Sequence, residues 1–428
     1  MFCQLEVLRH CFPPSVRRIL EELPESLDET YERILREIRK PNQGHAHQLL
    51  QCLVAAVRPL RVEELAEVLA VDFAVEGIPK LNLGWRWKDQ EEAVMSACSS
   101  LVVIVKDGDS RIVQFSHFSV KEFLTANRLA EPIRDVSRYH IRLEAAHTIL
   151  AQACLGVLLR LDDRVDRDKI KDFPLARYAA QYWPTHARFG NTSSHVMDGM
   201  KCLFDAEKPY FAAWFWIYNE EGGDEKSMST MCPEKPEASP LYYAAIFGFR
   251  DLAEHLIAEH PEYVTARGGP EQTPMHVAAS AGHANILSLL LEHGAEVDAL
   301  GHMGQTPLHR ASWNLEVEAG RCLLDHGADI NARNNNGLTP LGPAAYQDLE
   351  FTRMLVEHGA RINDHDSNGW TSLHWAVVSA NIQIVRLLLE HGADVNVRDN
   401  SGHTPSQFVS RRPEIAELLS KYGAKSVQ

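Results

Sequence analysis

The spacing of apolar positions along the chain predicts a mainly helical protein. Over residues 15–40 the apolar side chains recur every three or four positions, as one face of a helix requires, and Pro24 interrupts them. Ser26 followed by Glu29 has the spacing of a helix-capping pair, so we expect a new helix there. The same reasoning predicts helices over 45–57, 62–70, 91–99, 117–130, 143–161 and 173–183, the last ending at Pro184.

Two apolar runs depart from this helical pattern. Residues 101–105 (LVVIV) and 111–115 (RIVQF) flank a polar turn, which predicts a β-hairpin. Helices followed by a two-stranded wing describe a winged-helix-like α/β domain, which we place at 41–135. DNA binding is the familiar use of this fold, but its helix at 62–70 carries three glutamates and no basic residue. Glutamate repels phosphate, so we expect no nucleic-acid partner.

Further helical segments lead from this domain to a linker. We assign residues 136–218 to a helical domain that ends in PYFAAWFWIY (209–218), where six of ten residues are aromatic. We expect this helix to pack the helical domain onto the repeats, since a membrane-surface helix would carry flanking Lys and Arg. Residues 219–238 are polar and rich in Gly, Pro and charge, which predicts a linker or an exposed loop.

The remaining residues, 239–428, repeat with a period near 33 residues. Thr-Pro blocks or their variants begin at 239, 273, 306, 339, 371 and 404, and an HGA or YGA marker keeps the same period at 293, 326, 358, 391 and 422. Two markers in register indicate a repeat array, and the TPLH block resembles that of ankyrin repeats. The resemblance implies a solenoid of six repeats, each a finger-like turn and two antiparallel helices, that binds macromolecules and rarely carries chemistry.

Much of each repeat is explained as scaffold. Threonine suits a helix cap and proline the first helical position, and we expect the histidine of TPLH to bond the threonine hydroxyl and nearby backbone. Although the chain has 21 histidines, the 33-residue period places those of the blocks in separate repeats, so we expect no metal site. In repeat 4, Gly342 replaces the block histidine and Pro343 follows it. We expect this repeat to be the softest or most bent point of the array.

The positions left after this subtraction are candidates for binding. The resemblance places finger tips and exposed first-helix positions on a concave binding surface. Trp, Tyr and Arg are enriched among binding hot spots, because they combine large area with a polar group. The alternative is that the aromatic residues pack against neighbouring fingers. The candidate partner-binding residues are Trp313, Tyr346, Trp370, Arg333, Met303, His365 and Arg398.

Five segments of the first half carry a second resemblance. Residues 23–35, 58–73, 96–105, 114–124 and 173–183 are similar to the region that follows the nucleotide-binding module in fungal NACHT–ankyrin proteins, STAND-class signalling ATPases related to NLR immune receptors. The resemblance implies that residues 1–40 are a helical remnant following a NACHT module. It also implies that His117 is a nucleotide-sensing residue touching a bound diphosphate. The alternative is a polar joint in which Ser116 or Ser119 caps a helix and His117 completes a hydrogen bond.

The phosphate-binding loop of that family, GxxxxGK[ST], does not occur in this sequence. The segment GGDEKS (222–227) has two acids and no glycine before its lysine, so we do not expect it to bind phosphate. The sequence also lacks GxSxG, HExxH, GxGxxG and CxxC. We therefore expect neither catalysis nor a cofactor, but a scaffold or sensor that binds a protein through its repeats. The alternative is a fragment of a nucleotide-regulated STAND ATPase whose NACHT core lies outside this sequence.

Charge and cysteine usage narrow the class of partner and the compartment. The net charge is −15, with −6 in residues 1–238 and −9 in residues 239–428. This acidity argues against nucleic acid or anionic lipid as the main partner. Eight scattered cysteines suit a reducing compartment, and no apolar run reaches 18 residues. We expect a cytoplasmic protein without a membrane or metal partner.

Overall fold

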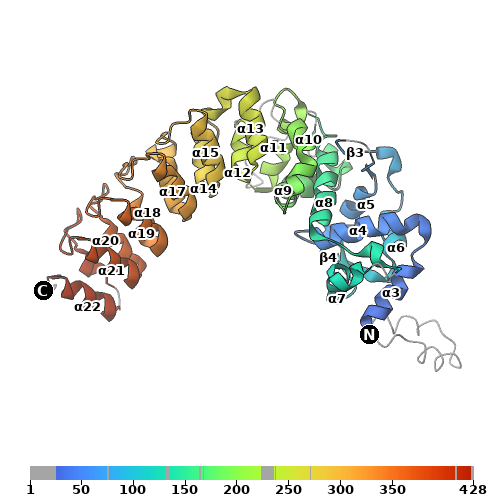
Figure 1. Cartoon of the computed structure of the whole chain (residues 1–428), viewed down its shortest axis with the longest axis horizontal. Helices are drawn as coiled ribbons and strands as arrows, with labels where there is room; N and C mark the ends of the chain where they lie inside the picture. Colours follow the sequence, from blue (N-terminus) through green and yellow to red (C-terminus); the bar gives the residue numbers. More distant parts are fainter. Residues whose placement is uncertain are drawn as a thin grey trace. The chain divides into compact units, whose positions relative to one another are not determined.

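The computed structural model describes residues 26–74, 77–131, 135–162, 165–166, 168–222, 236, 238–269, 271–409 and 412–425. The chain is mainly helical and divides into two compact units between residues 236 and 237 (Figure 1). The part of the expected 15–40 helix that precedes Ser26 lies outside the described residues. From there on, Ser26 caps a helix by accepting a hydrogen bond from the backbone N–H of Glu29 at 3.2 Å, as the sequence predicts.

The first unit combines helices with two small antiparallel sheets. Its α-helices are α3 (Leu27–Glu37), α4 (Gln43–Ala55), α5 (Val62–Val68), α6 (Gln90–Cys98), α7 (Phe118–Thr125), α8 (Leu143–Leu158), α9 (Ala176–Ala187), α10 (Thr192–Leu203) and α11 (Pro209–Gly222). Its 3₁₀ turns are η1 (Lys40–Asn42), η2 (Leu83–Trp85), η3 (Ser99–Leu101), η4 (Asn127–Ala130), η5 (Ser137–Tyr139) and η6 (Lys169–Asp172). Its strands are β1 (Leu60–Arg61), β2 (Val71–Asp72), β3 (Lys80–Leu81), β4 (Val102–Asp107) and β5 (Ser110–Phe115).

The hairpin that the sequence predicts is formed by β4 and β5. Its turn is tighter than expected: Asp107 pairs with Ser110, and Gly108 takes a φ of +57° at the first of two central positions. Strand β1 joins the other edge of β5, where Leu60 lies opposite Val113, so the sheet order is β1-β5-β4. Helices α4, α5 and α6 contact one another, and α4 and α5 also contact β5.

Helix α5 is packed into this domain by its own acidic side chains. Glu64 accepts two hydrogen bonds from the guanidinium of Arg58, at 2.8 and 2.7 Å. Glu67 pairs with Arg86 and accepts from the backbone N–H of Leu175 at 2.8 Å. Both carboxylates are at most 3% exposed. Two of the three glutamates that argue against DNA binding in the sequence, Glu64 and Glu67, are therefore structural ties that hold α5 in place.

Helix α9 corrects one expectation, because it does not end at Pro184. It continues to Ala187, and Arg188 N donates to the carbonyl of Pro184 at 3.0 Å. A proline inside a helix leaves the carbonyl four residues earlier without a donor. Here that carbonyl, of Ala180, accepts from the indole Nε1 of Trp214 at 3.1 Å. A side chain from α11 thus compensates for the proline.

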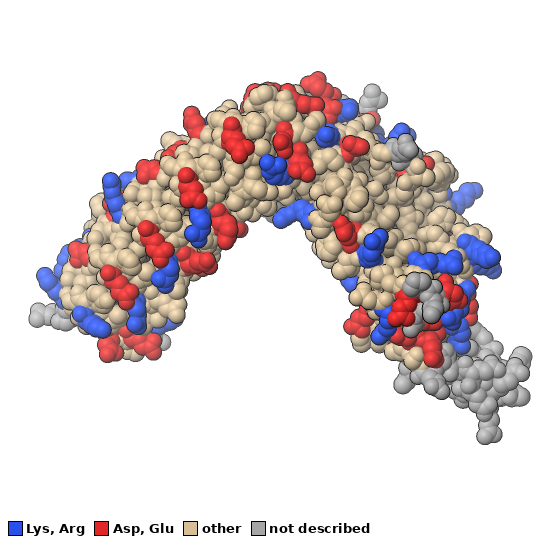
Figure 2. Space-filling view, viewed as in Figure 1, with Lys and Arg blue, Asp and Glu red and all other residues tan. Residues whose placement is uncertain are grey.

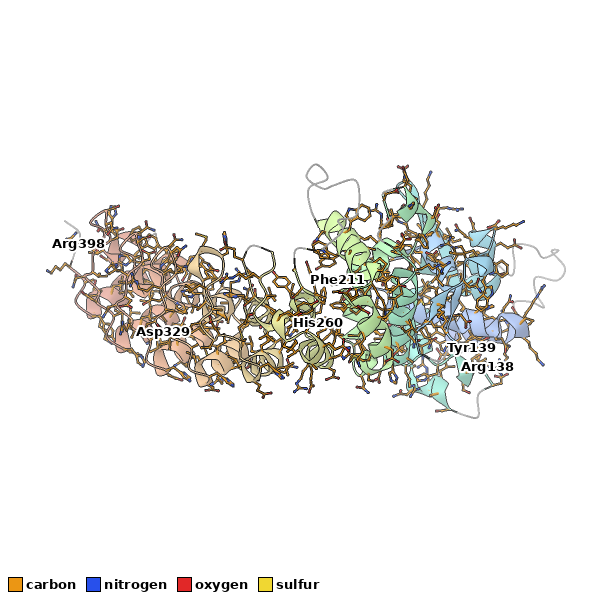
Figure 3. The ribbon with its side chains drawn as sticks, turned by 90° about the horizontal axis from the view of Figure 1, so that it is seen from above. Arg138, Tyr139, Phe211, His260, Asp329 and Arg398 are labelled. Atoms are coloured by element: carbon orange, nitrogen blue, oxygen red, sulfur yellow. The ribbon has the colours of Figure 1, made fainter. Side chains whose placement is uncertain are left out.

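The aromatic segment at 209–218 forms part of α11, which continues to Gly222, four residues into the expected linker. Residues 223–235 and 237 lie outside the described residues. Phe211 and Trp214 on α11 pack around Phe204, with ring centroids 5.5 Å from it in both cases, and Figure 3 shows Phe211 within the helical part of this unit. Within this unit α11 contacts α8, α9 and α10.

The second unit is a two-layer array of helix pairs (Figure 1). First helices contact the first helices of neighbouring repeats, and second helices do the same in the other layer. The first layer holds α12 (Pro240–Phe247), α14 (Pro274–Ser280), α16 (Pro307–Asn314), α18 (Leu341–Gln347), α20 (Ser372–Ser379) and η9 (Pro405–Phe408). The second holds α13 (Arg250–Glu259), α15 (Ala284–Glu292), α17 (Val317–Asp325), α19 (Leu349–Glu357), α21 (Ile382–Glu390) and α22 (Pro413–Lys421), while η7 (Pro261–Val264) and η8 (His302–Gly304) lie in connections.

Buried histidines link repeats 2, 3 and 5 to the repeats that follow them. In repeat 3, His309 Nδ1 accepts from the backbone N–H of Thr306 at 3.2 Å and lies 2.9 Å from its hydroxyl. The opposite ring atom, Nε2, donates to the carbonyl of Leu338 in repeat 4 at 2.9 Å. His276 and His374 make the same pair of contacts, with Nε2 to carbonyl distances of 3.0 and 3.5 Å. These histidines are fully buried.

The fingers between helix pairs use a second repeated device. Asp366 Oδ1 accepts from the backbone N–H groups of Asn368 and Trp370 at 2.8 and 2.9 Å, which closes a tight polar turn. Asp399 and Asn334 form the equivalent turns in neighbouring fingers. Successive fingers also bond directly through their backbones, over Met303–Asn335, Asn336–Ser367 and Asn368–Asn400 at 2.8–2.9 Å.

Repeat 4 replaces the histidine tie with apolar packing. A Cβ atom at Gly342 would lie 2.5 Å from Cδ1 of Leu338, so the leucine side chain fills the space of the missing imidazole. The first helix here begins at Leu341, one residue later in the block than its neighbours, so Pro343 falls in the first turn. First-turn N–H groups have no partner within the helix, and the proline therefore removes no helical hydrogen bond.

The tie between Trp214 and Ala180 generates a first prediction. Trp214→Phe keeps an aromatic ring but leaves the Ala180 carbonyl buried without a donor, so we expect a loss of about 1–3 kcal/mol beyond the packing cost. In a Pro184→Ala background the new N–H at position 184 can donate to that carbonyl, so Trp214→Phe should cost less there. Urea unfolding of the four proteins of this double-mutant cycle measures the difference. Equal costs in the two backgrounds would contradict the prediction.

The histidine ties predict a pH dependence of repeat stability. Burial lowers the pKa of His276 to about 4, below the value of about 6.5 of an unfolded chain, and it lowers the pKa of His309 and His374 as well. Because Nδ1 must accept, the folded array disfavours protonation. Stability is fully present above about pH 6.5, and it falls as the pH drops towards 4 because the unfolded state binds protons first.

The matched control comes from repeat 6, where Gln407 Oε1 accepts from the backbone N–H of Thr404 at 2.7 Å in place of histidine. A triple His276→Gln, His309→Gln, His374→Gln variant should be less stable at pH 7.5 but flatter between pH 6.5 and 4.5. Hydrogen exchange of the amides in α14, α16 and α20 measures both profiles. Parallel profiles for wild type and variant would show that the histidines do not carry the pH dependence.

Candidate functional site

Two positions of each block line one side of the first helices; most of them are at least partly exposed, whereas Tyr243, Val277 and Pro343 are buried. The two positions lie four and seven residues after the first residue of each block, as Arg310 and Trp313 do after Thr306, and so share one face of a helix. We call this surface the first-helix stripe. The fourth positions are Tyr243, Val277, Arg310, Pro343, Trp375 and Phe408, and the described seventh positions are Ile246, Ser280, Trp313, Tyr346 and Val378.

Two candidate aromatic residues are exposed at equivalent positions of this stripe. Trp313 in α16 and Tyr346 in α18 are 37% and 42% exposed. The Tyr346 ring lies edge-on to that of Trp375 in the next repeat, with centroids 5.9 Å apart. Trp375 is a partly exposed member of the stripe that sequence reasoning missed, although its place four residues after Thr371 is a usable signal. Its indole Nε1 is buried and has no hydrogen-bond partner among the described residues.

Trp370 has a different setting from the other two candidate aromatics. It lies in a finger and is only partly exposed. Its ring centroid is 5.1 Å from those of both Trp375 and Phe408, and its Nε1 donates to Asp399 Oδ2 at 3.3 Å. These contacts correspond to the alternative in which an aromatic residue packs against the adjacent finger. Trp370 therefore joins the stripe to the fingers of repeats 5 and 6.

The remaining candidates are exposed on the fingers. Met303 is 43% exposed and adopts a φ of +56° inside a finger turn. Arg333 donates to the carbonyl of His365 in the next finger, and its guanidinium lies 4.0 Å from Asp364. Arg398 donates to the carbonyl of Gly402 in its own finger and lies at the surface (Figure 3). The two arginines thus use part of their donor capacity to brace fingers.

His117 is exposed at the start of α7, where the hairpin ends. Its Nδ1 accepts from the backbone N–H of Ser119 at 3.3 Å, so His117 itself caps the helix, and neither Ser116 nor Ser119 does. The Ser119 hydroxyl lies 2.6 Å from the same Nδ1 and 2.8 Å from the hydroxyl of Tyr31. These contacts of Ser119 hold the imidazole through its Nδ1 atom. Within the described residues, Nε2 has no hydrogen-bond partner.

Glu67 is a buried acid beside a surface hollow, and its contacts give it a structural role. A hollow of about 160 Å³ is lined by Glu67, Arg86, Trp87, Lys171 and four further residues. Burial raises the pKa of Glu67, while the Leu175 N–H and Arg86 act against that shift. Because these partners use both carboxylate oxygens, Glu67 offers no free oxygen to a substrate. The hollow is also smaller than the roughly 300 Å³ of a typical ligand pocket.

Charge and composition give no sign of an ion or lipid site. Acidic and basic side chains are interspersed over the face of the repeat unit that Figure 2 shows. No group of three or more His, Cys, Asp or Glu side chains within the described residues is arranged to hold a metal ion. In the same part of the chain, none of the helices has the length and apolar character needed to cross a bilayer.

Comparisons with known proteins agree with these two units. The profile of the family "Ankyrin repeats (3 copies)" matches residues 241–334 and 331–399. The profile "GPI inositol-deacylase, winged helix domain" matches residues 31–133. The chain is 32% identical over 290 residues to "Azaphilone pigments biosynthesis cluster protein L" of Monascus ruber, a match covering 64% of this chain and 60% of that relative. The chain thus contains ankyrin repeats and a winged helix domain of the GPI inositol-deacylase type.

Proposed function

We propose that this protein is a non-catalytic scaffold or sensor that binds a protein partner through the first-helix stripe and fingers of its repeats. The observation that carries the proposal is the pair Trp313 and Tyr346, two large aromatic side chains exposed at equivalent positions of consecutive repeats. Such side chains combine a large apolar area with a polar group and dominate many protein interfaces. The match to the ankyrin-repeat family also suggests protein–protein interaction.

The proposal also covers the number of repeats, the finger residues of the binding surface, the cellular compartment and the origin of the protein. We count six repeats, because η9 and α22 continue the two layers beyond the last profile match at residue 399. Trp370, Arg333, Met303, His365 and Arg398 form the finger margin of the surface. The cysteines within the described residues, at positions 52, 98, 154, 202 and 322, are free thiols, which favours a reducing cytoplasmic setting. Similarity to a Monascus ruber protein supports a fungal origin.

Truncation of the two exposed aromatics tests this function. Trp313→Ala and Tyr346→Ala should each weaken partner binding by about 1–3 kcal/mol, because each removes a large contact area from the interface. The full-length protein is used for affinity capture with quantitative mass spectrometry, and dissociation constants are then measured for each captured partner.

The matched control is Tyr422→Ala, which removes an aromatic side chain of similar exposure, 40%, at the end of α22 in the second layer. This control should bind like the wild type. A double Trp313/Tyr346 variant that retains wild-type affinity for every partner, while its thermal stability falls sharply, would assign the two rings to packing and contradict the proposed function.

The second candidate function is that of a sensor arm in a STAND-type signalling ATPase whose NACHT core lies outside this sequence. The observation that favours it is His117, whose imidazole is exposed and fixed through Nδ1 while Nε2 is available to donate. A donor of this kind suits a diphosphate oxygen. The matched winged helix domain is consistent with this candidate.

This candidate predicts a nucleotide effect of His117. In a product of the same gene that includes a NACHT module, His117→Ala should weaken ADP binding by roughly 10- to 100-fold, the value of one hydrogen bond to a charged group. Isothermal titration measures the affinity. His45→Ala, which alters another exposed histidine of the first unit, is the control. Unchanged ADP affinity in the His117 variant would exclude this role.

A further inference from the structure

Among the described members of the first-helix stripe, Arg310 is the single charged residue. Of the eleven described positions of the stripe, nine are aliphatic or aromatic, with Tyr243 and Tyr346 included, and Ser280 is polar but uncharged. Arg310 lies in α16, three residues before Trp313, so the cation and the exposed indole share one helix face. A lone charge in an apolar surface has a large effect on which partner can bind there.

The guanidinium of Arg310 has few acceptors within the described residues. Its Nε is buried and has no hydrogen-bond partner there. Its Nη2 makes one long contact, 3.4 Å, with Ser280 Oγ, and that oxygen already accepts from Asn314 Nδ2 at 2.9 Å. No Asp or Glu of the described residues lies within ion-pair distance of it. Because the buried Nε is closed to a partner, the terminal nitrogens of this partly exposed side chain are the donors left for an acceptor from outside.

Three other arginines of the array, all in fingers, use their donors on the backbone. Arg267 donates to the carbonyls of Glu271 and Leu300 at 3.1 and 2.9 Å. Arg333 and Arg398 also donate to finger carbonyls. These contacts give each of the three a structural role in a finger. Within the described residues Arg310 makes no such contact to a carbonyl, so no finger contact explains its side chain.

The side chains around Arg310 do not supply a counter-charge. Tyr242 and His276 lie close enough for the cation to act on them. Burial raises the pKa of Tyr242 and lowers that of His276, so both are neutral near pH 7. The repeat unit as a whole carries a net charge of −9. This charge disfavours a polyanion such as nucleic acid, whereas a single carboxylate in an apolar segment meets Arg310 at short range.

We propose that the stripe binds a protein segment presenting one carboxylate beside a large apolar side chain, with the carboxylate on Arg310 and the apolar side chain on Trp313 and Tyr346. This inference rests on the proposed function and names the chemistry of the partner. A guanidinium matches a carboxylate in a two-pronged geometry, which gives both strength and orientation. The Asn314 amide lies beside the pair and can help to orient it.

The test selects ligands without knowledge of the natural partner. A displayed library of random 12-residue peptides is enriched on the full-length protein, and binding of individual peptides is measured by fluorescence anisotropy. Enriched peptides should carry Asp or Glu within a few residues of Trp, Phe or Leu. Changing that acid to Asn or Gln should weaken peptide binding to the wild-type protein by roughly 10- to 100-fold. The same change should weaken peptide binding to the Arg310→Met variant by less than about twofold.

Two variants serve as controls for charge and folding. Arg353→Met removes an exposed arginine from α19 in the second layer and should leave peptide affinity unchanged. Arg310→Glu should lose the acidic peptide and regain affinity when the peptide acid is changed to Lys, a gain that misfolding cannot produce. Thermal unfolding of each variant confirms that the array is intact.

The outcomes separate this inference from the function on which it rests. Peptides that lose affinity with Trp313→Ala but not with Arg310→Met overturn the carboxylate inference and leave protein binding by the stripe in place. A selection that yields no peptide sensitive to Trp313→Ala contradicts the proposed function and, with it, the inference. Enrichment of peptides that lack an acid also overturns the carboxylate inference and leaves protein binding by the stripe in place.

Discussion

A buried imidazole that bonds in two directions holds successive repeats together. Its Nδ1 accepts from the threonine that starts its own helix, and its Nε2 donates to a carbonyl of the next repeat, as His309 does towards Leu338. A single repeat cannot bury its apolar face, so such links between neighbours are part of folding itself. The tie requires a neutral ring, which makes the array sensitive to acid. Repeat 4, where Leu338 fills the space over Gly342, shows that apolar packing can replace the tie.

The first unit depends on polar groups brought together from distant segments. Glu67 on α5 meets Arg86 and the N–H of Leu175, and the indole of Trp214 satisfies a carbonyl that Pro184 leaves without a donor. In each case a buried polar group would be costly alone and is harmless once paired. The consequence is that the carboxylates of Glu64 and Glu67 on α5 are committed to structure.

The repeat surface combines rigidity with a narrow chemical character. Backbone bonds between fingers and histidine ties between neighbouring repeats fix the spacing of the first-helix stripe, so Trp313, Tyr346 and Arg310 lie on a rigid framework. Such preorganisation lowers the entropy lost on binding. In the function that we propose, the exposed aromatics supply contact area and the Arg310 guanidinium, which has no counter-charge among the described residues, supplies direction. The proposal therefore favours an apolar segment with one acid over a densely charged ligand.

The sequence alone determined the repeat period, the helix caps and the β-hairpin, because these depend on local spacing and on residues with strong conformational preferences, such as Thr-Pro at helix starts. It also placed Trp313 and Tyr346 at equivalent positions. Only the tertiary structure showed that Trp370 packs against Phe408, that the rings of Tyr346 and Trp375 meet, and that Arg310 lacks a counter-charge among the described residues. It also decided the length of α9, since a proline ends a helix unless a distant donor replaces its missing N–H. Local patterns cannot reveal partners that come from elsewhere in the chain.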